Sequence, residues 1–220
     1  MKKCTLIIIG IFIISFLNIK ADMKTFGTNG VGVMDTNMQE AWPDDSQEAY
    51  HTYYICPGGV GTEKRALLKF KNIFKSDGGT IENGSTIQFA YLALRYYQSG
   101  SFTSGKFEVY RVKKDWGEGT STNSKVEIGA ACWDAPKHGF PKWEKAGCDG
   151  ESDRTQIGIP GEALCQEGST GNKDIAIDIT SFVQAWSNGE PNYGLIIISK
   201  GLGGDRTAGF AFRAHEQTVS

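Results

Sequence analysis

Apolar and polar residues alternate along this chain in short runs that glycine- and aspartate-rich turns separate. Within residues 64–71, Ala66, Leu68 and Phe70 share one face. Such a period of two is typical of a half-buried β-strand. The same pattern predicts further strands over residues 50–56, 86–97, 106–113, 174–179, 193–199 and 208–216. Short antiparallel strands joined by turns predict an all-β protein, specifically a β-sandwich.

The run over 86–97 is the longest of these predicted strands. One of its faces would carry Leu92 and Leu94, and the other would carry Phe89 and Tyr91. A core-facing side and a solvent-facing side are therefore expected along its whole length.

One segment follows a helical period instead. Thr180 can cap a short helix in which Phe182, Val183 and Trp186 share a face, and Gly189 can end it. The sequence therefore predicts one short helix beside the strands.

Two long stretches lack a convincing strand pattern. Residues 22–49 are predicted to be loop, and residues 120–172 hold no convincing strand longer than five residues. A loop of the second length inside a compact domain is uncommon unless it is tied down or functional.

The N-terminal segment has the layout of a secretory signal. The positive start Lys2-Lys3 precedes an apolar run over 5–17, and Ala21 offers a small residue for cleavage. This predicts a signal peptide over residues 1–21 and a single secreted, extracellular domain over residues 22–220. The alternative is a membrane anchor, which needs about 20 apolar residues, more than this run provides.

Charge narrows the range of partners. The chain has 23 basic and 25 acidic residues, and the predicted signal contains three of the basic ones and no acid. The mature domain would therefore carry a net charge near −5. A mildly acidic surface argues against nucleic acid and anionic membranes as partners.

Four cysteines lie in the predicted mature domain: Cys56, Cys132, Cys148 and Cys165. An even number in an exported chain predicts disulfides, and three pairings are possible. The pairing Cys132–Cys148 is favoured because both residues lie in the same predicted loop. Cys56–Cys165 would then be the remaining pair. The alternative is a zinc site, which the sequence favours less because no two cysteines are two to four residues apart and the chain has three histidines.

Several segments occur in an order that a known family shares. They are Arg65–Phe70, Ile81–Leu94, Val109–Gly119, Trp133–Arg154, Ile177–Gly194 and Phe212–Glu216. Together they resemble the DNRLRE family of extracellular domains, which includes carbohydrate-binding modules attached to polysaccharide lyases. The resemblance covers about residues 30–216 and implies a jelly-roll-like sandwich. The chain departs from the family in having Cys132 where the family has Thr, and in stopping before the family's last strand.

Aromatic rings beside polar groups predict a sugar-binding surface, because rings stack on the apolar faces of pyranoses. The candidates are Trp133, Trp143, Tyr91, Asp134 and Arg154, with Trp42 and Phe89 as further aromatic residues. The alternative for Trp133 and Trp143 is that they pin the long loop to the sandwich.

Aspartates on turns suggest a calcium site, since Ca²⁺ prefers oxygen ligands. Asp35, Asp44 and Asp45 are the candidate ligands, and Ca²⁺ is the one cofactor that the sequence suggests. The alternative is that these are solvated turn carboxylates, because their spacing matches no regular calcium loop.

No nucleophile motif accompanies the three histidines, so catalysis is not expected. The predicted function is binding of a polysaccharide or cell-surface glycan. The alternative is a structural cell-surface or filament subunit that self-associates through an open sheet edge. Neither function is expected to involve a membrane once the signal has been cleaved. A polysaccharide-cleaving enzyme using a carboxylate pair is the least favoured hypothesis.

Overall fold

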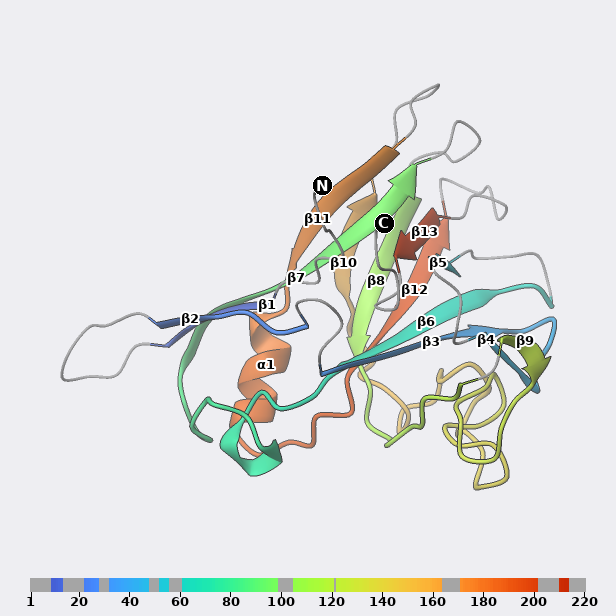
Figure 1. Cartoon of the computed structure of the whole chain (residues 1–220), viewed down its shortest axis with the longest axis horizontal. Coiled ribbons are helices and arrows are strands. Elements are labelled where there is room, and N and C mark those ends of the chain that lie inside the picture. Colours follow the sequence, from blue (N-terminus) through green and yellow to red (C-terminus); the bar gives the residue numbers. More distant parts are fainter. Residues whose placement is uncertain are drawn as a thin grey trace.

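The computed structural model describes residues 9–13, 22–27, 32–47, 52–55, 61–98, 105–120, 122–163, 171–201 and 210–213. They form mainly β-strands in three antiparallel sheets, with the α-helix α1 (Thr180–Ser187) (Figure 1). No helix within these ranges combines the length and the apolar character needed to cross a membrane.

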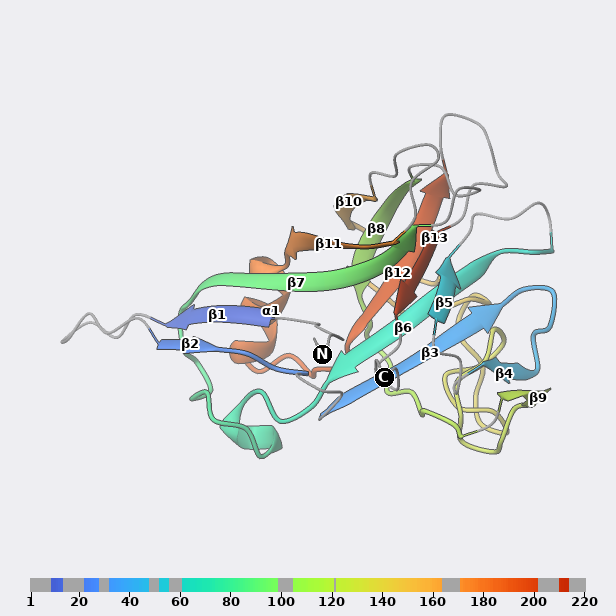
Figure 2. The same cartoon turned by 45° about the horizontal axis from the view of Figure 1, so that its top comes forward.

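The first sheet is organised around the long strand β7 (Ile87–Gln98). Its strand order is β2 (Asp22–Lys24), β1 (Ile9–Ile13), β7, β13 (Phe210–Arg213) and β5 (Thr52–Ile55). A further strand, β11 (Gly171–Asp178), pairs with β7 from Tyr91 to Gln98. Since β1 and β13 also pair with β7 and overlap this stretch, they share its opposite edge (Figure 2).

The second sheet has the order β10 (Ile159–Ala163), β8 (Gly105–Arg111), β12 (Leu195–Gly201), β6 (Lys64–Phe70) and β3 (Val33–Gln39). The small third sheet pairs β4 (Asp45–Gln47) with β9 (Thr122–Lys125). A 3₁₀ turn, η2 (Lys75–Asp77), follows β6.

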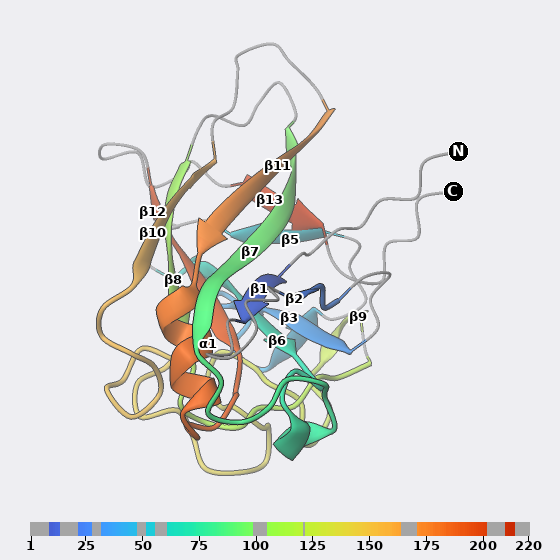
Figure 3. The ribbon, with the colours of Figure 1, turned by 90° about the vertical axis from the view of Figure 1, so that its left-hand side faces the viewer.

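One hydrophobic core takes side chains from both large sheets. Leu92 and Ile177 enter it from the first sheet, and Leu68, Val109 and Ile197 enter it from the second. Phe182, Val183 and Trp186 of α1 belong to the same core, and α1 lies along the N-terminal part of β7 (Figure 3). The alternation predicted for 86–97 therefore marks the buried face of β7. In β6 it marks the face toward this core, but Arg65 and Leu67 on the other face are buried as well.

A second core lies on the opposite face of the second sheet. It joins Leu67, Tyr110, Ile196 and Ile198 of the strands to residues of the segment between β8 and β10, hereafter the 112–158 segment. Figure 1 shows this segment, which includes β9 and is coloured yellow and yellow-green, gathered beside β3 and β4. Burial on both faces explains why the Leu195–Ile198 run is apolar without interruption.

Most predicted elements occur close to their predicted places. The strands predicted at 64–71, 86–97, 106–113, 174–179 and 193–199 correspond to β6, β7, β8, β11 and β12. The predicted loop over 22–49, by contrast, contains β2, β3 and β4. The polar residues of β3 concealed it, because they interrupt the alternation of a strand that is buried along its whole length.

The start of α1 also differs from the prediction. Thr180 does not cap the helix; its Oγ1 accepts a hydrogen bond from the N–H of Ala90 at 2.9 Å. Oδ1 of Asp178 accepts instead from the N–H of Thr180, at 2.9 Å. The threonine thus ties the helix to β7, and the preceding aspartate satisfies the first helical N–H.

Strand β1 lies within the predicted signal peptide. It pairs with β7 through Ile9↔Leu92 and Ile11↔Ala90. Cleavage after Ala21 would remove β1 and open the edge of β7 that it covers.

Candidate functional site

Tryptophan side chains fix the 112–158 segment to the second sheet. The indole N–H of Trp116 donates to the carbonyl oxygen of Tyr193 at 2.8 Å, and that of Trp143 donates to the carbonyl oxygen of Cys132 at 3.0 Å. Both rings belong to the second core, as does Trp133. Buried indoles with satisfied N–H groups therefore anchor the segment against the sheet.

This burial removes two of the predicted sugar-stacking rings. Trp143 is 4% exposed, and the Arg65 guanidinium lies 5.1 Å from the ring centroid of the buried Trp133. Neither ring offers a free face to a sugar. The structure instead shows the alternative arrangement, in which both tryptophans pin the segment to the sheet.

The predicted polar partners of those rings are engaged within the protein. Arg154 is buried, with its guanidinium 4.0 Å from the ring centroid of Tyr110 and one nitrogen 2.6 Å from Oδ1 of Asp149. Asp134 accepts a hydrogen bond from Nζ of Lys142 at 2.6 Å. These residues therefore stabilise the segment in this structure.

A buried carboxylate, Asp153, organises the middle of the segment. It accepts hydrogen bonds from the N–H groups of Glu144, Lys145 and Gly150 at 2.9, 3.0 and 2.9 Å. Nζ of Lys114 lies 2.6 Å from Oδ1 of Asp153. Burial alone would raise the pKa of Asp153, but the bond from Lys114 and the backbone N–H groups lower it below its usual value.

The predicted Cys132–Cys148 disulfide is absent. Both are free, buried thiols, and they belong to different hydrophobic clusters. Sγ of Cys148 contacts the carbonyl oxygen of Asp153 at 3.7 Å, and burial raises the pKa of this thiol. Indoles and ion pairs therefore hold the segment where a disulfide was expected. Cys56 and Cys165 lie outside the described residues.

The three aspartates predicted to bind calcium do not form one group. Asp35 is 2% exposed on β3, and its N–H donates to Oε1 of Glu118 at 2.9 Å. Asp44 is exposed in the turn before β4. Asp45 begins β4, and its side chain is outside what the structure describes.

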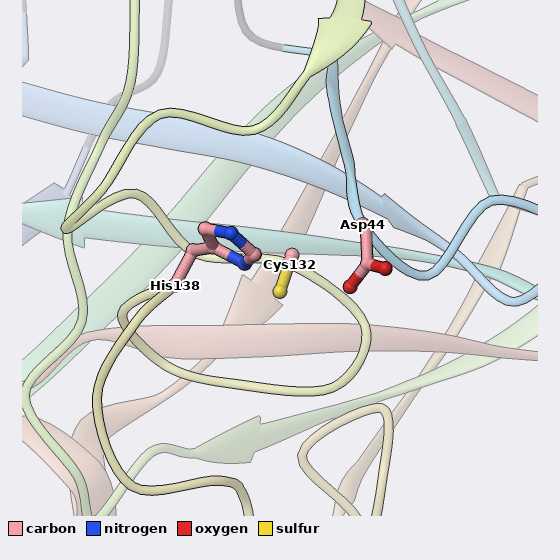
Figure 4. Close-up of side chains that lie close together, drawn as sticks. All are labelled: Asp44, Cys132 and His138. Carbon is pink, nitrogen blue, oxygen red and sulfur yellow. The ribbon is translucent and has the colours of Figure 1, made fainter.

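Asp44 lies instead beside Cys132 and His138. One potential ligand atom from each of these residues lies within 4.8 Å of the others (Figure 4). Among the described residues, this is the one group of three or more His, Cys, Asp or Glu side chains whose arrangement could hold a metal ion. Sequence reasoning missed it because Asp44 is remote from the other two along the chain.

An exposed pair of aromatic rings, Phe89 and Tyr91, lies on the face of β7 that points away from the core. Phe89 is 46% exposed and Tyr91 is 39% exposed. Their ring centroids are 6.5 Å apart and their planes differ by 14°. We call these two residues the aromatic pair. Of the three rings predicted to contact sugar, Tyr91 is exposed, whereas Trp133 and Trp143 are buried.

Polar and small residues of β11 and of β7 itself border the aromatic pair. Asp178 is the cross-strand neighbour of Tyr91, and the next outward-facing neighbours are Ala93 and Ala176. Beyond them, Arg95 and Asp174 form two hydrogen bonds, both of 2.6 Å. The result is a sheet face with two rings, small side chains and carboxylates in a row.

A cavity of about 410 Å³ lies near the end of α1, on another part of the molecule. Its lining includes Lys69, Lys71, Asn72, Trp186 and Asn192. These residues come from separate segments, so no sequence motif marked the cavity.

No protein-family model matches this chain, and no curated protein is detectably similar to it. The resemblance of residues 30–216 to the DNRLRE family therefore stays a prediction.

Proposed function

We propose that this protein is a secreted, non-catalytic domain that binds polysaccharide, and that its two large sheets form a jelly-roll-like β-sandwich. The observation that carries the proposal is the aromatic pair, two nearly parallel exposed rings on one strand. Exposed aromatic rings on a rigid sheet lose little conformational entropy when a ligand stacks on them. Polysaccharide binding at the outward face of β7 does not require Trp133 or Trp143, which are buried in the second core.

The surroundings of the aromatic pair favour a neutral polysaccharide. Asp174 and Asp178 are exposed beside it, and the guanidinium of Arg95 is already bonded to Asp174. Carboxylates can accept hydrogen bonds from sugar hydroxyls, whereas they would repel the carboxylates of a polyuronate. A neutral, β-linked glycan with flat pyranose faces therefore suits this surface best.

Replacing Tyr91 or Phe89 with alanine is expected to weaken binding to a neutral polysaccharide by about tenfold each, because each change removes one stacking ring. Affinity electrophoresis in gels containing neutral or acidic polysaccharides measures this effect. The matched control is Phe140→Ala, which removes an exposed ring from the 112–158 segment.

Retention of the unmodified protein by a neutral polysaccharide supports the proposal if it is about tenfold weaker in the two β7 variants and unchanged in Phe140→Ala. Equal retention of all four proteins contradicts it, as does the absence of retention on every gel of the panel.

A second candidate function is self-assembly at the cell surface or in an extracellular filament. It is favoured by the position of β1, which covers the edge of β7 from Ile87 to Leu92 and would leave with the predicted signal. An uncovered edge can accept a strand from a second copy of the chain.

For this second candidate, we expect the exported protein to form larger species as its concentration rises. Sedimentation velocity over a series of concentrations, with electron microscopy of the same samples, measures this. A single monomeric species at every concentration rejects self-assembly and leaves polysaccharide binding untouched.

A further inference from the structure

The group of Asp44, Cys132 and His138 is assembled by backbone hydrogen bonds. The N–H of His138 donates to the carbonyl oxygen of Ala130 at 2.7 Å, and the N–H of Gly129 donates to that of His138 at 2.9 Å. These bonds fold the chain back on itself, so that the imidazole faces Cys132 (Figure 4).

Asp44 reaches the same place through the third sheet. The N–H of Val126 donates to the carbonyl oxygen of Asp44 at 2.8 Å, and the neighbouring Asp45 pairs with Lys125. The three side chains therefore come from two separate parts of the chain that the β4–β9 pairing holds together.

The donor set has the chemistry of a zinc site. One sulfur, one imidazole nitrogen and one carboxylate oxygen lie within 4.8 Å of one another. Tetrahedral Zn²⁺ with bonds of about 2.0–2.3 Å holds its ligand atoms roughly 3–4 Å apart. The three side chains would therefore need to move only about an ångström closer together to bind the ion. Ca²⁺ prefers oxygen ligands alone and does not suit a thiolate and an imidazole.

Burial raises the pKa of the Cys132 thiol, and the carboxylates of Asp44 and Asp134 add to the rise, while backbone hydrogen bonds at Ala135 and Asp134 oppose it. Zn²⁺ would displace the proton of this thiol on binding, because the ligand form of cysteine is the thiolate. Cys132 is also free of a disulfide, so its sulfur is available for coordination. Cys148 is equally buried, but it belongs to no such group among the described residues.

We infer that Asp44, Cys132 and His138 bind one Zn²⁺ ion, with the fourth coordination position open to water. Asp44 is exposed and His138 is half-buried, so the position is reachable from solvent. The ion would tie the turn before β4 to the 112–158 segment, which is the kind of cross-link that the predicted disulfide would have provided. This site is independent of the aromatic pair and of the proposed polysaccharide binding.

Cobalt titration of the purified protein tests this inference. We expect one equivalent of Co²⁺ to bind, with tetrahedral visible bands and a thiolate-to-cobalt band in the near ultraviolet, and Zn²⁺ to displace it. Asp44→Asn is expected to weaken binding on the order of 100-fold, at least as much as the loss of an outer-shell partner does in known sites. Cys132→Ser is expected to abolish the thiolate band, and the matched thiol control, Cys148→Ser, is expected to keep it.

Thermal unfolding gives a second readout that does not depend on the spectrum. Because Asp44 is exposed, Asp44→Asn should fold like the metal-free parent, and added Zn²⁺ should raise the Tm of the parent alone. Less than about one-tenth of an equivalent of bound Co²⁺, or a thiolate band that survives Cys132→Ser, overturns the inference. A disulfide at Cys132 in peptide maps of the exported protein overturns it as well.

Discussion

Replacing Trp143 with alanine is expected to lower the free energy of unfolding by about 3–5 kcal/mol, the usual cost of truncating a large buried aromatic side chain. The ring is 4% exposed in the second core, and its indole N–H donates to the carbonyl oxygen of Cys132 at 3.0 Å. The variant therefore loses packing and also leaves a buried acceptor without this bond. Urea unfolding followed by circular dichroism measures the change, provided that the transition is two-state.

The matched control for this change is Trp42→Ala, because Trp42 is 53% exposed in the turn before β4. Its expected cost is within about 0.5 kcal/mol. At temperatures where Trp143→Ala is still folded, its affinity for a neutral polysaccharide should equal that of the parent. A folded Trp143→Ala variant of normal stability that no longer binds the polysaccharide would place the sugar site on the 112–158 segment and contradict the account.

Replacing Asp153 with alanine is expected to cost about 3 kcal/mol or more. The Asp153 carboxylate accepts hydrogen bonds from the N–H groups of Glu144, Lys145 and Gly150, and the change leaves these groups without an acceptor. It also removes the ion pair with Lys114. Breaking a buried, hydrogen-bonded charge typically costs about 3–5 kcal/mol, and the partial exposure of Lys114 places this case near the lower limit. The same urea experiment measures it.

Asp153→Asn keeps one oxygen acceptor and is expected to lose roughly half as much stability as the alanine variant. An exposed aspartate of η2, changed in Asp77→Asn, serves as the control for loss of a carboxylate elsewhere. If Asp153→Ala were as stable as Asp77→Asn, the 112–158 segment would not depend on the buried carboxylate.

The sequence predicted a strand well where one face of the strand is buried and the other is exposed, because apolar and polar residues then alternate along it. In β7, Ala90, Leu92 and Leu94 face the core, while Phe89 and Tyr91 face solvent. The sequence of β3 contains aspartate, threonine, asparagine and glutamine, yet every residue of the strand is buried. Polar residues covered on both faces carry no periodic signal, so this strand could not be found from pattern alone.

The candidate sites show the same limit. Tyr91 could be predicted as exposed because its strand has two distinct faces. Trp133 and Trp143 occur in irregular chain, where no period tells a buried ring from an exposed one. Counting cysteines predicted a disulfide between Cys132 and Cys148, which the structure does not form. Only the fold brings Cys132 beside Asp44 and His138.

The most direct test of polysaccharide binding on β7 is an NMR titration of the isotope-labelled protein with a neutral β-linked oligosaccharide. The account predicts that chemical-shift changes concentrate on the outward face of β7 and β11, around Phe89, Tyr91 and Asp178, and that Tyr91→Ala removes them. Changes concentrated at residues 129–158, with β7 and β11 unaffected, would contradict it.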